Sequence, residues 1–96
     1  MYIEFEWDVG KAESNLQKHA VSFEAAKLVF YDLGTIYEQD RVVDGETRWQ
    51  AIGWGGTVAL LVAHTSTETG EIEKIRIISA RQANKGEKGR YERANR

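Results

Sequence analysis

Cysteine is absent from this 96-residue sequence, so the chain forms no disulfide framework and offers no thiolate to a metal. A small domain without disulfides suits a reducing compartment. No apolar run approaches the roughly 20 residues that cross a bilayer. The first residues also lack the basic flank and apolar stretch of a secretion signal. We therefore expect a cytoplasmic protein with no membrane association.

Proline is absent as well, and no low-complexity stretch predicts a linker. With 42% hydrophobic residues the chain can build one core, and we expect a single domain over residues 1–96. Histidine is scarce: His19 and His64 lie far apart without i+4 partners, so we predict no metal site. Phosphate-binding glycine motifs and the serine nucleophile motif are missing, and we expect no cofactor.

The charge is distributed unevenly along the chain. The net charge is −2, but residues 1–80 carry a balance of −6 and residues 81–96 a balance of +4. A polyanion would meet a mildly acidic body with a basic end. The plainer interpretation of such a charge run is a solvated terminal helix.

The first third of the chain predicts a strand followed by two helices. Residues 2–7 alternate and are rich in β formers. Asp8 is a good N-cap for a helix through Lys18, and Ser22 for a second one. Phe23, Ala26 and Phe30 would form the apolar face of this second helix. Asp32-Leu33-Gly34 should end it, with Gly34 just beyond the C-cap.

The remainder predicts four strands and a last helix. We expect a short strand at 35–37, a longer one at 46–54, a turn at Gly55-Gly56 and a strand at 58–63 that is buried on both faces. A turn at 69–71 leads to a strand at 72–80, and helical spacing begins at Gln82. The predicted fold is α+β: an antiparallel meander with two N-terminal helices and a C-terminal helix, in the order β-α-α-β-β-β-β-α.

The last predicted strand carries the chemistry. If it is regular, Lys74 and Arg76 share one face, while Arg81 lies on the other face at the strand end. A strand inside a sheet fixes its side chains well, which suits holding a guanidinium against a phosphate. The alternative is that each arginine only pairs with a carboxylate. The terminal helix adds Lys85 and other cations, which favours RNA as the ligand.

Cleavage of RNA needs a group that takes the 2′-hydroxyl proton, cations that stabilise the phosphorane, and a donor for the leaving oxygen. Arginine and lysine serve the second need without a metal. For the proton transfers the candidates are Glu46, His64, Glu87 and Tyr91. His64 would end the central strand near solvent, or be a buried polar residue. Glu46 and Arg48 share a strand face, where they either act together or simply pair.

At this level of detail the chain resembles the BrnT family, the toxin half of a bacterial type II toxin–antitoxin pair. The order and spacing of matching segments hold over nearly the whole chain. They are Phe5-Glu6-Trp7-Asp8, Lys11-Ala12, Asn15 to Ala26, Val29 to Asp32, Gly45 to Trp49, Ile52-Gly53, Arg76 to Ala83, Glu87 and Tyr91-Glu92.

The resemblance implies a fold similar to RelE-type ribonucleases and a toxin that cleaves RNA and stops translation. It implies neutralisation by a BrnA-like antitoxin with a ribbon-helix-helix DNA-binding domain, which alone touches the operator DNA. It is compatible with a homodimer of the toxin within a heterotetramer. By motif position, the RNA site would lie near Arg48, Arg76 and Arg81, with Glu46, Lys18 and Glu87 as further members; Lys85 and Tyr91 are additional candidates for RNA contact.

Two positions depart from the family pattern. Ala20 replaces the glycine that usually follows Lys-His, and an alanine is less suited to a turn with positive φ. The hairpin after His64 reads Thr65 to Gly70, without the arginine that members often carry there. The second departure supports an alternative function, a non-catalytic module that binds RNA or the antitoxin. A purely structural domain is a third hypothesis.

Overall fold

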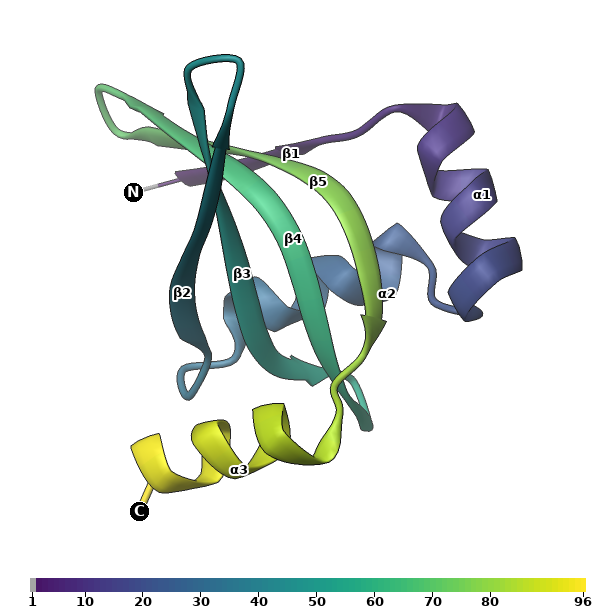
Figure 1. The fold of residues 1–96 in the computed structure, drawn as a ribbon. Helices are drawn as coiled ribbons and strands as arrows, with labels where there is room; N and C mark the ends of the chain where they lie inside the picture. The colour runs from purple at the N-terminus through teal and green to yellow at the C-terminus, as the bar shows by residue number, and fades with distance from the viewer. Residues whose placement is uncertain (1) are drawn as a thin grey trace.

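A computed structural model describes residues 2–96. These residues form one five-stranded sheet, three α-helices and a 3₁₀ turn (Figure 1). The elements are β1 (Tyr2–Glu6), α1 (Val9–His19), α2 (Phe23–Lys27), η1 (Leu28–Tyr31), β2 (Ile36–Val43), β3 (Glu46–Gly55), β4 (Val58–Thr69), β5 (Ile72–Gln82) and α3 (Lys85–Ala94). The α+β class and the predicted order of elements are therefore confirmed.

The strands lie in the order β1-β5-β4-β3-β2, and β4 is central as predicted. One part of the predicted topology is wrong: β1 pairs with β5 in parallel, so the sheet is mixed. The other neighbours follow each other through hairpins, which impose antiparallel pairing. No hairpin joins β1 to β5, because two helices and three strands intervene, so nothing local sets their relative direction.

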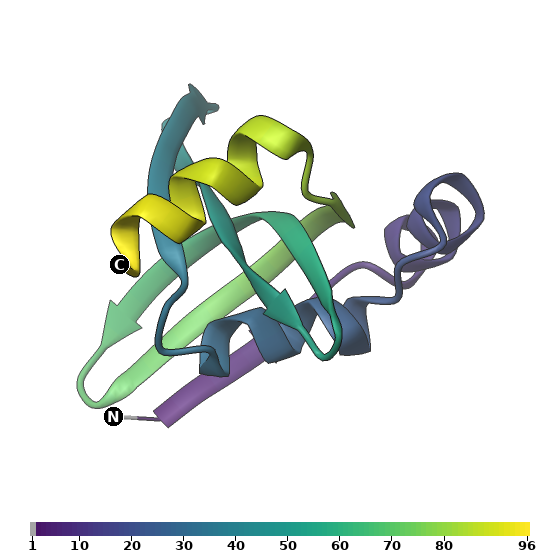
Figure 2. The same ribbon diagram turned by 90° about the horizontal axis from the view of Figure 1, so that it is seen from below.

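The sheet has two differently covered faces (Figure 2). The α2 face, covered by α2 and η1, holds the larger core, which includes Phe23, Val29, Val62, Ile75 and Ile77. The α3 face is covered by α3 over only one end, where Ile52, Leu61 and Ala83 are buried. Leu61 and Val62 lie on opposite faces, so the predicted burial of β4 on both sides is confirmed. No helix of the described residues covers the rest of the α3 face.

Helix α1 covers the edge of β5 beyond the end of β1. Asp8 caps α1 as predicted, accepting a hydrogen bond from the Lys11 N–H. Asn15 is buried and pairs with the backbone of Ala80, to which its side chain both donates and accepts. This amide takes the place of a neighbouring strand and satisfies a ladder position that would otherwise be unpaired. Helix α1 ends at Ala20 in the left-handed conformation, with φ of 56°.

The second helical segment has the predicted N-cap, Ser22, but a different end. It tightens into η1 and stops at Tyr31, so Gly34 is not the residue after a helical C-cap and its φ is not positive. Gly34 instead donates its N–H to the Asp32 carboxylate. A Cβ here would lie 2.6 Å from the Tyr91 hydroxyl, so a larger residue would have to displace that side chain.

Strand β2 is longer than the three residues predicted, and its polar outer half explains the error. Its residues from Glu38 to Val42 are largely exposed, so they show no alternation of apolar side chains. The turn that follows, Asp44-Gly45, has positive φ at both residues, as a type I′ hairpin requires. This Asp-Gly pair was the available signal that a strand precedes it.

The most consequential irregularity is a β-bulge in β5. Ser79 lies opposite Ala63 and Ile77 lies opposite His64, so Ile78 is an extra residue on the β5 side. The bulge reverses the alternation of side chains after Ile77. The prediction that Arg76 and Arg81 point to opposite faces is therefore wrong: both point to the α3 face. The prediction assumed that the four residues between them continue the regular alternation of a strand.

Candidate functional site

The uncovered part of the α3 face presents rows of side chains that the strand register defines. Arg81 lies opposite Leu61, Ser79 opposite Ala63, and Arg76 opposite Thr65. On the other side of β4, Gln50 lies opposite Ala63, and the same register sets Arg48 level with Thr65. Because neighbouring strands are about 4.8 Å apart, Arg48 and Arg76 flank Thr65 at roughly 10 Å from each other. We call this surface the arginine platform: Glu46, Arg48, Thr65, Arg76, Ser79 and Arg81.

Arg76 and Glu46 form an ion pair across β4, whose small threonines separate them. Both side chains are about two-fifths exposed, at 41% and 43%, so the pair remains open to solvent and to a ligand. A carboxylate held beside a guanidinium can accept a proton while the cation stabilises negative charge nearby. The structure therefore brings Glu46 and Arg76 together, although 30 residues separate them in sequence.

Arg81 is held rigidly by Glu87 from the first turn of α3. Two guanidinium nitrogens donate to the two carboxylate oxygens at 2.8 and 2.9 Å. Hydrogen bonds from Arg81 keep the pKa of Glu87 below its usual value, and the same contact raises the pKa of Arg81. Glu87 also closes a capping box with Asn84.

Glu87 was predicted to contact RNA, and its environment favours a different role. Its side chain is 8% exposed and both oxygens are occupied. An anion in that position is better suited to orient Arg81 than to approach a phosphate. One signal of this role was present in the sequence, the Asn84-x-x-Glu87 spacing of a capping box.

Arg48 differs from the other two arginines because nothing neutralises it within residues 2–96. Its Nε is buried without a hydrogen-bond partner, and no carboxylate lies within ion-pair distance of its guanidinium. A buried donor without a partner is costly, so its retention calls for an explanation such as an external acceptor. Thr65 and Ser79, which form the floor between the arginines, were missed as site residues because their positions depend on the register.

His64 lies apart from the arginines. It was expected near the solvent-exposed end of the central strand, but β4 continues to Thr69 and His64 is 3% exposed within it. Its ring packs against Phe30 on the α2 face, with centroids 4.8 Å apart. Burial lowers the pKa of His64. The prediction that His64 joins the arginines in one site is not supported, because the sheet separates them.

The remaining predicted RNA contacts are spread around the platform. Lys18 is exposed at the end of α1 and shares a hollow with Ser79, so it borders the platform. Lys85 is exposed at the first position of α3. Tyr91 faces away, since its hydroxyl donates to Asp32 at 2.9 Å and helps to fasten α3 to the sheet. Lys18 and Lys85 therefore remain candidates for RNA contact, while Tyr91 has a structural role.

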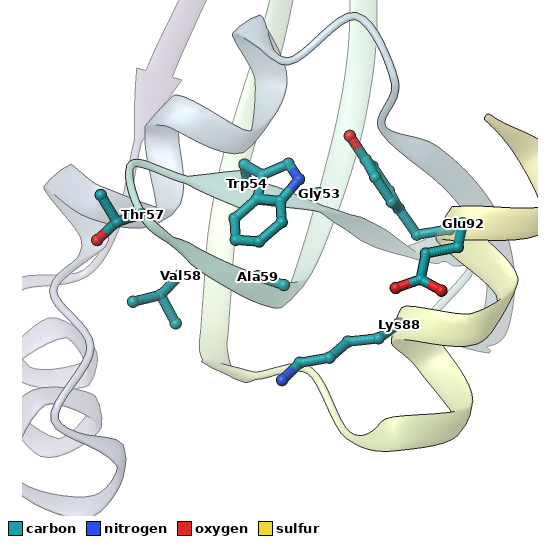
Figure 3. Close-up of a pocket in the computed structure, with 8 residues that line it drawn as sticks. Gly53, Trp54, Thr57, Val58, Ala59, Lys88 and Glu92 are labelled. Carbon is teal, nitrogen blue, oxygen red and sulfur yellow. The ribbon is translucent and has the colours of Figure 1, made fainter. Parts of the chain in front are cut away.

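A second hollow on the α3 face, of about 260 Å³, lies between α3 and the β3–β4 hairpin (Figure 3). Trp54 and Val58 line it from the hairpin, and Lys88 and Glu92 from the helix. Gly53 at its base must be glycine, because a Cβ there would lie 2.1 Å from the Thr35 hydroxyl. No arginine of the platform lines this hollow.

Comparison with known proteins identifies the family. The model of the ribonuclease toxin BrnT of type II toxin–antitoxin systems matches residues 7–87. The chain belongs to this family. BrnT membership makes the chain a ribonuclease toxin of a type II system and implies an antitoxin partner. No curated protein matches the chain.

The matched range contains most of the predicted BrnT site. It includes every residue of the arginine platform and extends through Glu87, the partner of Arg81. Among residues 2–96 no three His, Asp or Glu side chains are grouped as metal ligands would be. The helices in the same range are too short or too polar to span a bilayer.

Proposed function

We propose that this BrnT protein is a metal-independent endoribonuclease whose active site is the arginine platform. The observation that carries the proposal is the β5 bulge, because it turns Arg81 to the face that already holds Arg76 and Arg48. Three guanidinium groups on one open sheet surface suit an RNA backbone. We also propose that the fold is of the RelE type, which the two N-terminal helices, the C-terminal helix and the sheet between them support.

In the proposed reaction, Glu46 takes the proton from a ribose 2′-hydroxyl, whose oxygen attacks the adjacent phosphorus. The bond to the 5′-oxygen breaks, which leaves a 2′,3′-cyclic phosphate and a free 5′-hydroxyl. Arg48, Arg76 and Arg81 stabilise the added negative charge on the phosphorane. The leaving oxygen takes its proton from solvent, which reaches this uncovered surface.

The test is induction of the chain alone, followed by cleavage of purified RNA in EDTA. We expect growth arrest, RNA degradation and activity that persists with the chelator. Arg76→Ala and Arg81→Ala should each abolish arrest. An active Arg76→Ala variant would remove the residue assignment, and cleavage that stops in EDTA would remove metal independence.

A second candidate is a non-catalytic module that binds RNA or the antitoxin. It is favoured by the β4–β5 hairpin, whose exposed tip from Thr67 to Glu71 carries no arginine. Growth without arrest, together with RNA binding that weakens as salt rises, would support this candidate. RNA cleavage by the purified chain would exclude it.

We further propose that the antitoxin is BrnA-like, with a ribbon-helix-helix domain that makes all contacts to operator DNA. The family membership supports a partner of this kind. In this proposal both proteins are cytoplasmic, the toxin inhibits translation only when the antitoxin is lost, and two toxin chains assemble in the heterotetrameric complex. A neighbouring reading frame for a short ribbon-helix-helix protein, and the mass of the joint complex, would test it.

A further inference from the structure

The α2 face contains a cleft for which neither the fold nor the proposed catalysis has a use. It lies beyond η1, between the β2–β3 and β4–β5 hairpins, has a volume of about 490 Å³ and opens to solvent. Strand neighbours define its walls. They are Tyr37 and Trp49 on one side, His64 and Ser66 in the centre, and Glu68 and Glu73 on the other.

Aromatic rings form one part of this cleft and fix its shape. Trp49 lies directly opposite His64 in the β3–β4 pair. The His64 ring stands at 77° to that of Tyr37 and at 86° to that of Phe30, so it is held from both sides. These contacts make a rigid wall with exposed ring faces, which attracts flat cationic groups.

Hydrogen-bond acceptors outnumber donors among the side chains of the cleft, whose donors include a tyrosine hydroxyl and a tryptophan indole. His64 Nδ1 is 3.2 Å from the Val62 carbonyl, which can only accept, so the proton lies on Nδ1. Nε2 therefore keeps a lone pair, and it has no partner within residues 2–96 although the residue is only 3% exposed. The Ser66 hydroxyl already donates to Glu73.

Two carboxylates lie side by side on one wall of the cleft. Glu68 and Glu73 are direct cross-strand partners, and neither forms an ion pair with any residue in the described range 2–96. Like charges directly opposite in a sheet are destabilising. A local conflict of this kind, beside an aromatic wall and a ring nitrogen without a partner in the described residues, is typical of a site that is completed by a ligand.

We propose that this cleft receives an arginine side chain presented by a protein partner. The guanidinium stacks on the aromatic wall and donates to Glu68, Glu73 and His64 Nε2. The planar guanidinium, with its fork of N–H donors, matches the geometry of two carboxylates. An ammonium group matches it less well. RNA is not the occupant, because its phosphates would meet two uncompensated negative charges. The inference is independent of the proposed catalysis, which concerns the opposite face.

The experiment uses the intact chain, labelled with ¹⁵N, and N-acetyl-arginine amide as the probe. We expect saturable shifts at millimolar concentration for the Trp49 indole, which a Trp49→Phe spectrum assigns, and for amides of β4 and β5 around Glu68 and Glu73. N-acetyl-citrulline amide, which has the same shape without charge, should cause no saturable shift. N-acetyl-lysine amide should bind at least several-fold more weakly.

Matched charge variants separate this cleft from general attraction to an acidic surface. Glu73→Gln should weaken binding about tenfold, because a hydrogen bond between two charged groups is lost. Glu71→Gln removes the same charge from the neighbouring turn, outside the cleft, and should leave binding unchanged. The proposal would be overturned if the citrulline or the lysine amide bound as tightly as the arginine amide. It would also be overturned if the two substitutions had equal effects, or if the shifts were confined to the arginine platform.

Discussion

The two faces of the sheet differ in what covers them and in the charge of what remains open. On the α3 face, the uncovered part carries three arginines over small side chains, Thr65 and Ser79. On the α2 face, the uncovered part carries aromatic rings and two carboxylates. One sheet therefore offers a surface for a polyanion on one side and for a cation on the other.

Arg48→Ala should produce a large loss of activity. If Arg48 stabilises the phosphorane, its removal should lower the rate of RNA cleavage by roughly 100-fold or more. The free energy of unfolding should not fall, because Nε has no partner to lose. Arg41→Ala is the matched control, since Arg41 is exposed on the edge strand β2. A large loss of stability with Arg48→Ala would mean that this arginine serves the fold.

Asn15→Ala should cause the largest loss of stability. It leaves the Ala80 N–H and carbonyl unpaired at a buried edge, which costs about 2–4 kcal/mol in unfolding free energy. Urea unfolding measures the change, with the exposed Gln17→Ala on the same helix as control. Because α1 lies against the bulged part of β5, activity should also fall. An unchanged urea midpoint would show that the backbone N–H and carbonyl of Ala80 find other hydrogen-bond partners.

Glu87→Gln should have an intermediate effect that depends on pH. The folded-state pKa of Glu87 is lowered, so its stabilisation is present above the unfolded pKa of about 4.3 and is lost as pH falls through the folded value. Acid titration of the free energy of unfolding should therefore show a weaker pH dependence below about pH 4.5 in the variant. The exposed Glu92→Gln serves as control. If the free energy of unfolding of both proteins depended equally on pH in the acidic range, the role of Glu87 as the anchor of Arg81 would be contradicted.

Ala20→Gly should stabilise the protein slightly. Ala20 has φ of 56°, where an L-residue other than glycine is strained, so relief of about 1 kcal/mol is expected. Thermal unfolding measures the gain, and Ala12→Gly inside α1 should instead destabilise by a similar amount. A neutral or negative effect of Ala20→Gly would show that the turn is not strained.

Local signals predicted much of the fold correctly. Asp8 and Ser22 cap the first two helices, and the turns at Gly56 and Gly70 have the positive φ that their hairpins need. The unbroken apolar run in β4 also predicted correctly that this strand lies at the centre of the sheet. Each of these features depends on a few adjacent residues, so a single sequence contains the information.

The errors concern features that depend on strand pairing. The bulge at Ile78 changes the face of Arg81, and nothing in the sequence around it announces an extra residue. The parallel direction of β1 and the burial of His64 against Phe30 arise only when distant segments meet. The residue types of the candidate site were predictable, but their distribution between two faces required the register.

The most direct test of the division between the faces is RNA cleavage in EDTA by two matched variants. Glu46→Gln removes a carboxylate from the α3 face, and Glu73→Gln removes one from the α2 face, with the same change of charge and shape. We predict that Glu46→Gln loses most of the cleavage rate while Glu73→Gln keeps nearly all of it. Full activity of Glu46→Gln, or inactivity of a folded Glu73→Gln, would contradict it.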